Sequence, residues 1–304
     1  MLGDGPNYQA FAEKAAAGVV DFTIVGCHGQ SFVASIFYLI TGSKYAICWT
    51  SIVLFCLSII LSGLIIYRCT NQKIFSILFP LTLIGMPSLL WEIRSGGTAI
   101  GIIFISLLLV YLCITKNRIS VFVYFISWLF RPYCAALFPL LLIPYERHKS
   151  TYGFFLYGAA GLCLLVSCYS LSFIQTGTMI NAHSLQAHAT DSVSGSLDIS
   201  VKNILENTGN LFFVKSDWSS TIHKICRPLI SITVLVFGIT GLLQIHHGNL
   251  FLWSILFNYC LYAITVFGLT KYLLPAYTLL FIGCGIVLSR GRFFAPHNRL
   301  RSIS

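Results

Sequence analysis

Long apolar runs separated by short basic turns are the feature that most constrains this chain. Residues 45–67 form a run long enough to cross a bilayer as a helix, and Arg68 and Lys73 close it. Of the 304 residues, 57% are hydrophobic and only 9% are charged, which leaves too little polar surface for a soluble globular protein. The runs are continuous and do not alternate, so a transmembrane β-barrel is excluded. We predict an all-α, polytopic transmembrane helical bundle.

The runs predict about nine passes, some of them short. Residues 119–130 and 133–143 form either one kinked span or two short passes, because Arg131-Pro132 must disturb the helix between them. Two short passes bring the basic turns and the tail to one side, which the positive-inside rule makes cytoplasmic, so we prefer this arrangement. The passes are residues 45–67, 74–91, 98–114, 119–130, 133–143, 152–174, 228–245, 250–269 and 272–288, and the basic turns are 68–73, 116–118 and 147–149.

This topology divides the chain into five parts. We expect an outer acidic loop with interfacial, in-plane helices at 1–43, where the apolar stretch after residue 28 is too short to span. An N-terminal transmembrane bundle follows at 44–174, then one long outer loop at 175–227. C-terminal transmembrane helices occupy 228–289, and 290–304 form a basic cytoplasmic tail.

The net charge of +10 does not indicate a nucleic-acid partner, because the cations lie in the turns between apolar runs. That distribution is typical of topology signals and contacts with membrane lipids. None of the eleven cysteines forms a CxxC pair, so redox chemistry and a thiolate metal site have no support.

Charged residues on the predicted outer side are the candidate functional residues. Acids are scarce, nine in all, and three of them (Asp4, Glu13, Asp21) lie within the first 21 residues. They belong either to an ordinary solvated terminus or to a site beside the bilayer. Three cations lie at the outer ends of predicted passes: Arg94, Arg131 and Lys271. Any one of them would suit a lipid headgroup, but together with the acids they favour a site for a phosphate-bearing substrate.

Five segments follow one another along the chain: GDGPNY with AFAEKAAAG, HGQSFVASIFYLITG, RSGGTAIGIIFISLLLVYL, FRPYCAALFPLLLIPY and TKYLLPAYTLLF. In this order they resemble the GT-C superfamily of membrane glycosyltransferases, of the ArnT-like or PMT-like kind that uses polyprenyl-phosphate sugars. The first segment is similar to the acidic first outer loop of that family, and the second to the in-plane segment after it. The resemblance covers roughly residues 1 to 289, and its specificity comes from the order of the segments.

The resemblance implies a hexosyl- or pentosyltransferase. It would transfer a sugar, with inversion, from a polyprenyl-phosphate-linked donor to a glycan or lipid acceptor at the outer (periplasmic) face of the bacterial inner membrane. Asp4 would be the base, with Asp21 the second choice and Glu13, paired with Lys14, at the surface. Residues implied to bind the carrier phosphate are Arg94, Arg131 and Lys271, and those implied to contact sugar or carrier are Tyr8 and Tyr272.

Two departures from the family pattern stand out. Family members begin with a transmembrane helix that leads into the acidic loop, whereas Asp4 lies three residues after Met1. We therefore expect the chain to lack that helix, as a truncated product or a degenerate relative. Lys271 stands where the matching element often has Arg, which keeps the charge but loses the bidentate fork.

Two other functions and a metal remain open. An exopolysaccharide or O-antigen polymerase shares an acidic outer loop and an arginine ahead of an apolar span, like Arg94. A transporter or flippase for an anionic lipid would show broken helices or intramembrane charges, and only Arg131-Pro132 qualifies. No cofactor is certain: His183, His188 and Asp191 are candidate ligands for a divalent metal, but their spacing fits no compact motif, so we assign no metal ligand.

Overall fold

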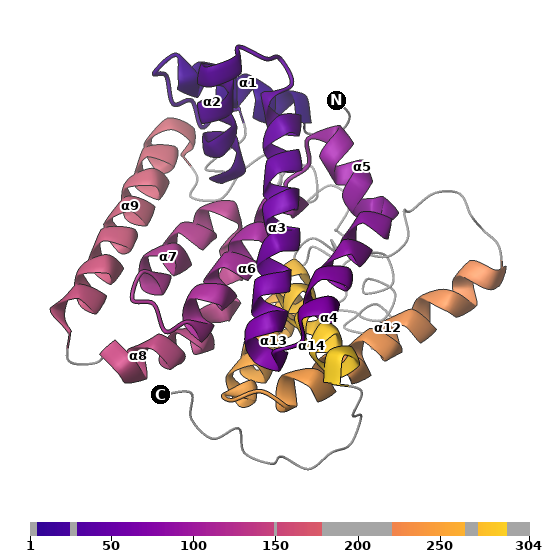
Figure 1. Cartoon of the computed structure of the whole chain (residues 1–304). Helices are drawn as coiled ribbons and strands as arrows, with labels where there is room; N and C mark the ends of the chain where they lie inside the picture. The colour runs from indigo at the N-terminus through magenta and orange to yellow at the C-terminus, as the bar shows by residue number, and fades with distance from the viewer. Residues whose placement is uncertain (1–4, 25–28, 149–150, 178–220, 265–272, 291–304) are drawn as a thin grey trace.

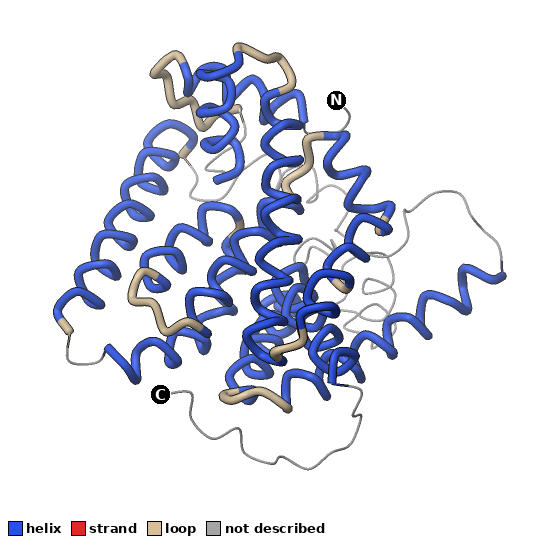
Figure 2. Tube along the Cα trace, viewed as in Figure 1, coloured by secondary structure: helices blue, strands red, loops and turns tan. Residues whose placement is uncertain are grey.

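The computed structural model describes residues 5–24, 29–148, 151–177, 221–264 and 273–290. These residues form α-helices and 3-10 helices and contain no strand, which confirms the all-α class (Figure 2). In chain order the elements are α1 (Gly5–Ala16), α2 (Gly29–Thr41), α3 (Ala46–Thr70), α4 (Lys73–Leu78), η1 (Pro80–Gly85), α5 (Pro87–Ser95), α6 (Ala99–Ile114), α7 (Ser120–Phe130), η2 (Pro132–Leu141), α8 (Leu142–His148), α9 (Tyr152–Thr176), α12 (Thr221–Leu243), α13 (Gly248–Ile264) and α14 (Leu274–Arg290).

Two described helices are long and apolar enough to cross a membrane, α3 and α9, and they match the predicted passes 45–67 and 152–174. A third qualifies if the bent pair 73–85 and 88–95 is one span. Five other predicted passes fall on shorter apolar helices, and the pass 133–143 falls on the 3-10 helix η2. Helix α12 begins at Thr221, ahead of the expected residue 228. The multi-pass helical class is therefore confirmed, and the count of nine stays a prediction.

The helices α1 and α2 lie together over the first turns of α3, as Figure 1 shows. Three phenylalanines, Phe11, Phe22 and Phe32, hold them with ring centroids 5.2 to 6.1 Å apart. Ile47 at the start of α3 completes this small core, which is separate from the core of the bundle. We call α1, α2 and the loop between them the cap.

Proline breaks the predicted pass 74–91. Pro80 begins η1 and Pro87 begins α5, where a proline nitrogen has no hydrogen to donate to a preceding turn. The helix axis of this segment bends by 66° between residues 73–85 and 88–95. At its far end Gly96 has a φ of 74°, a left-handed conformation that suits glycine and ends α5.

The chain reverses at Arg131-Pro132. Arg131 is extended, with φ −163° and ψ 136°, and η2 returns along α7. The Tyr124 hydroxyl of α7 donates to the Ala135 carbonyl of η2 over 3.1 Å, which joins the two helices side by side. The returning piece is a 3-10 helix that contains Pro139 as well as Pro132. The preferred interpretation, a turn and not a kinked span, is confirmed.

The predicted basic turns gather at one end of the bundle. Arg290 donates to the carbonyls of Cys69 (2.6 Å) and Gln244 (2.9 Å), and His148 bonds the Lys116 carbonyl (2.7 Å). His247 Nε2 lies 3.8 Å from Glu146 Oε2. This approach brings the contacts of Arg290 close to the contact of His148. We call residues 68–73, 116–118, 146–148, 244–247 and 290 the basic end. The opposite end, with the cap, the turn 95–98 and Arg131, is the cap end.

Candidate functional site

The turn between α5 and α6 is the centre of the candidate site at the cap end. Arg94 lies in the last turn of α5, and its carbonyl accepts a hydrogen bond from the Cys48 thiol of α3 (3.8 Å). Arg131 reaches the same turn from the end of α7, because its Nη2 donates to Thr98 Oγ1 over 3.2 Å. Two of the three predicted phosphate-binding cations thus lie at this turn, Arg94 through its place in the chain and Arg131 through its side chain.

Arg131 is held without being neutralised. Its side chain is partly buried, and its Nε lies out of contact with solvent without a hydrogen-bond partner in the described part of the chain. No carboxylate among those residues lies within ion-pair distance of it. A desolvated guanidinium with unused donors favours an anion that accepts from its planar fork. Arg94, by contrast, is exposed.

Glu92 is a residue of this site that the sequence analysis missed. Its Oε2 accepts from the Ala99 N–H over 3.3 Å, at the first residue of α6, where a carboxylate suits the helix dipole. Gly97 leaves room for this carboxylate, because a Cβ there would overlap it and displace the Glu92 side chain. Glu92 was hidden at the end of an apolar run in WEIRSGG, although the scarcity of acids was a usable signal.

The cap presents its own acids differently. Asp21 accepts from Lys14 Nζ over 2.8 Å and from the backbone and hydroxyl of Thr23. These bonds lower the pKa of Asp21 to about 2, and the bond from Lys14 makes the largest contribution. A carboxylate with so low a pKa is a poor proton acceptor. Lys14 therefore pairs with Asp21, whereas Glu13 accepts from Gln9 over 2.8 Å. The geometry favours a structural role for Asp21.

Tyr8 is 6% exposed and belongs to the core of the cap. That position suits packing of the cap better than contact with a substrate. The other predicted site residues, Asp4, Lys271 and Tyr272, lie outside the described residues, as do His183, His188 and Asp191. Within the ranges that the structure describes, no group of three or more His, Cys, Asp or Glu residues could hold a metal ion.

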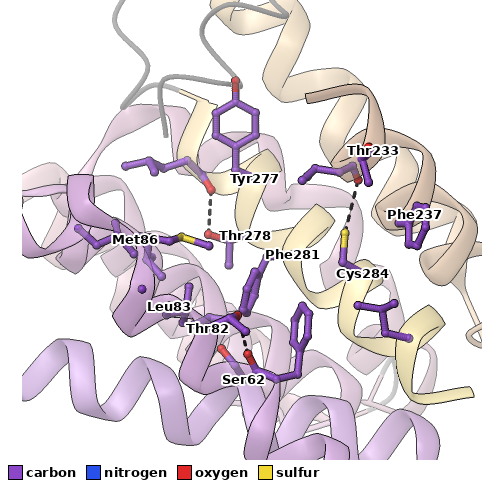
Figure 3. A pocket seen from close by; sticks show the side chains of 18 residues that line it. Ser62, Thr82, Leu83, Met86, Thr233, Phe237, Tyr277, Thr278, Phe281 and Cys284 are labelled. Carbon is purple, nitrogen blue, oxygen red and sulfur yellow. Dashed lines mark hydrogen bonds between the residues drawn. The ribbon is translucent and has the colours of Figure 1, made fainter. Parts of the chain in front are cut away.

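An apolar cavity of about 430 Å³ lies between α3, the bent segment, α6, α12 and α14 (Figure 3). Its lining includes one face of α14 at helical spacing, from Leu274 to Leu288, so the cavity extends over about 21 Å of that helix. A cavity that extends this far along one helix suits a chain molecule. The remaining α14 residues of the lining are Tyr277, Thr278, Phe281 and Cys284.

Five polar side chains of the lining donate hydrogen bonds to backbone carbonyls. Thr278 donates to Leu274 (2.8 Å), Thr82 to Phe79 (2.6 Å) and Ser62 to Ser58 (2.7 Å). Thr233 and Cys284 do the same, to Leu229 and Val234. Because these hydrogens already have acceptors, the cavity favours a hydrocarbon over a sugar.

Glycines allow the close crossing of α12 and α14, the two helices that line one side of this cavity. A Cβ on Gly283 of α14 would overlap the Gly238 carbonyl of α12, and one on Gly241 would overlap the Gly283 carbonyl. The two backbones therefore approach as closely as small residues permit.

Asn258 connects the cavity with the Arg131 turn. It is fully buried on α13, where its Oδ1 accepts from the Ala276 N–H (3.3 Å) and its Nδ2 donates to the Tyr133 carbonyl (3.5 Å). Tyr133 lies two residues after Arg131, and Ala276 lies in the first turn of α14. The start of α14, at one end of the cavity lining, therefore lies beside the chain that carries Arg131.

Two crystal structures of ArnT share this fold. The crystal structure of ArnT from Cupriavidus metallidurans bound to undecaprenyl phosphate superposes with a TM-score of 0.61, covering 95% of this chain and 56% of that chain at 12% identity. The apo structure of the same enzyme gives a TM-score of 0.56, with 95% and 55% covered and 13% identity. The chain has an ArnT-like GT-C fold, and it spans just over half the length of these structures.

No protein-family model matches the sequence, and no curated protein matches it. The shared fold and the apolar helices make the chain an integral multi-pass membrane protein. The resemblance seen in the sequence is thus confirmed at the level of the fold.

Proposed function

We propose that this chain is a membrane glycosyltransferase that takes a sugar from a polyprenyl-phosphate carrier and transfers it to a glycan or lipid acceptor. The observation that carries the proposal is the apolar cavity along α14, whose first turn is joined through Asn258 to the chain around Arg131. A long hydrocarbon and an adjoining phosphate are what these two features would accept. ArnT, which shares the fold, has been solved with undecaprenyl phosphate.

The cavity supplies the binding energy for the carrier tail. Each square ångström of apolar surface removed from water contributes about 25 cal/mol, so a tail that occupies this lining binds mainly through the hydrophobic effect. Arg131, with Arg94 and Lys271 as further proposed ligands, would bind the phosphate. A cation there also stabilises the charge that grows on the leaving phosphate as the bond to the sugar breaks.

The reaction is an inverting substitution at the anomeric carbon. The acceptor oxygen forms the new bond to that carbon, the bond to the phosphate oxygen breaks, and polyprenyl phosphate leaves. The acceptor proton passes to a carboxylate, for which we propose Asp4. Glu92 is a second candidate, because it flanks the turn that Arg131 contacts. We place the reaction at the cap end and propose that this end faces the periplasm, opposite the basic end.

The direct test is transfer in membranes that contain the full chain. We expect radiolabelled sugar to move from an undecaprenyl-phosphate donor to endogenous acceptors, and expect the Asp4→Asn variant to insert normally but lose transfer. Addition of one sugar supports the proposal, whereas a ladder of products indicates a polymerase. Movement of the intact carrier across the membrane without transfer would contradict it. An EDTA arm tests whether a divalent metal is needed.

A further inference from the structure

Gln30 makes three hydrogen bonds through its side-chain amide at the cap end. It is fully buried on α2, and its Nε2 donates to Ser51 Oγ of α3 (2.8 Å) and to the Gly97 carbonyl (3.0 Å). Its Oε1 accepts from the Gly101 N–H of α6 (3.1 Å). One side chain thus ties together α2, α3, α6 and the turn before α6.

The orientation of this amide is fixed by its partners. The Gly97 carbonyl only accepts and the Gly101 N–H only donates, so the amide nitrogen and oxygen cannot exchange places. Ser51 uses its own hydroxyl hydrogen on the Ile47 carbonyl (3.0 Å) and therefore accepts from Gln30. No other uncharged side chain of this length offers both a donor and an acceptor.

Both residues of the contact between Arg131 and Thr98 have chain neighbours near this amide. Thr98, the acceptor, follows Gly97 directly in the chain. On the other side, the ring of Phe130, the residue before Arg131, fills the space where a Cβ on Gly29 or Gly101 would be, at 2.5 and 2.9 Å. A Cβ on Gly101 would also meet Gln30 Oε1 at 2.5 Å.

We infer that Gln30 is a positioning residue that holds Arg131 and the 97–98 turn in the arrangement that receives the carrier phosphate. This inference rests on the proposed function, because it assigns Gln30 to the phosphate-binding part of that site. Gln30 is buried and acts through Gly97 and Phe130, so it does not itself touch the carrier. Its removal should affect the phosphate more than the tail.

The test compares two lipids that differ only in the charged group. Binding of undecaprenyl phosphate and of undecaprenol to the full chain in lipid nanodiscs is measured by native mass spectrometry. We expect the wild-type protein to prefer the phosphate, and expect Gln30→Met to lower that preference about tenfold while undecaprenol binding stays within about twofold. Gln30→Glu keeps the length and the acceptor for Gly101 but cannot donate to Gly97, so it should lower the preference as well.

Matched variants separate positioning from folding. Ser51→Ala removes one bond of the amide but leaves both bonds to the turn and α6, so its preference should match the wild-type protein. Thr98→Val removes the acceptor of Arg131 and should behave like Gln30→Met. Equal losses for both lipids, or an unchanged preference in folded Gln30→Met or Gln30→Glu, would overturn the inference. A wild-type protein that does not prefer the phosphate would instead contradict the proposed function.

Discussion

The two ends of the bundle use their cations in opposite ways. At the basic end Arg290 bonds two backbone carbonyls, Cys69 and Gln244, and His148 bonds a third. At the cap end the helices are joined by uncharged amides, Gln30 and Gln175 among them, the latter donating to the Val20 carbonyl and accepting from the Phe22 N–H. Arg131 bonds one threonine hydroxyl there.

This difference separates cations that hold the fold from cations that are left for a ligand. Carbonyls near the ends of helices carry partial negative charge, and two of them accept from Arg290, so the protein itself satisfies this cation of the basic end. A guanidinium bonded to a neutral hydroxyl keeps its full charge and most of its donors. Function is therefore expected to concentrate at the cap end, and stability at the basic end.

Among the variants that test this difference between the two ends, removal of Arg131 should have the largest effect on carrier binding. We expect Arg131→Ala to weaken undecaprenyl phosphate binding about 100-fold, because a charged hydrogen-bond partner of the phosphate is lost in a partly desolvated site. Arg131→Lys should retain part of the affinity, since it keeps the charge without the fork. The measurement is native mass spectrometry in nanodiscs, with the melting temperature as a check on folding. Full affinity in the alanine variant would remove Arg131 from the site.

Removal of Arg290 should have the opposite result. We expect Arg290→Ala to lower the free energy of unfolding by about 2 kcal/mol, because two carbonyls lose a charged donor, and to leave the preference for undecaprenyl phosphate over undecaprenol unchanged. Arg68→Ala is the matched control, an exposed arginine at the same end, and should change stability little. The stability of both variants is measured by thermal unfolding in detergent. A loss of phosphate preference in Arg290→Ala would show that the two ends are not independent.

The cavity offers a change that affects the tail and not the phosphate. Leu107 is buried and belongs to the lining, so Leu107→Phe should narrow the cavity and weaken both undecaprenyl phosphate and undecaprenol about tenfold. Thr278→Val should bind both lipids normally, since its hydroxyl serves the Leu274 carbonyl. If the phenylalanine variant lost only the phosphorylated lipid, the cavity would not be the tail site.

Features that depend on local pattern were predictable from the sequence. Apolar length gave α3 and α9, and Arg131-Pro132 gave the reversal between α7 and η2, because proline blocks the helix whatever surrounds it. The clustering of the basic turns followed from alternation of short passes. The shared position of Arg94 and Arg131 at the turn 95–98 followed from the same topology.

Features that depend on which helices become neighbours were not predictable. Gln30 looks like one polar residue in HGQSFVAS, and its role exists only because Gly97 and Gly101 lie beside it. The cavity is lined by five separate parts of the chain, and no local pattern reports the space between them. The same holds for Asp21, because its ion pair with Lys14 depends on how the chain folds after α1 and is not visible in the sequence.

Substitution of Asp21 should have the smallest effect on carrier binding. It tests whether this acid of the cap has a structural role or a catalytic one. Its pKa is lowered from 3.8 to about 2, so the folded cap favours the ionised form. The stabilisation is thus present above about pH 4 and is lost as the pH falls towards 2. We expect Asp21→Asn to remove this acid dependence in thermal unfolding of the cap, followed by hydrogen exchange. At neutral pH it should change undecaprenyl phosphate binding less than twofold, because an exposed ion pair contributes little. Loss of sugar transfer in this variant with the cap intact would return Asp21 to the catalytic site.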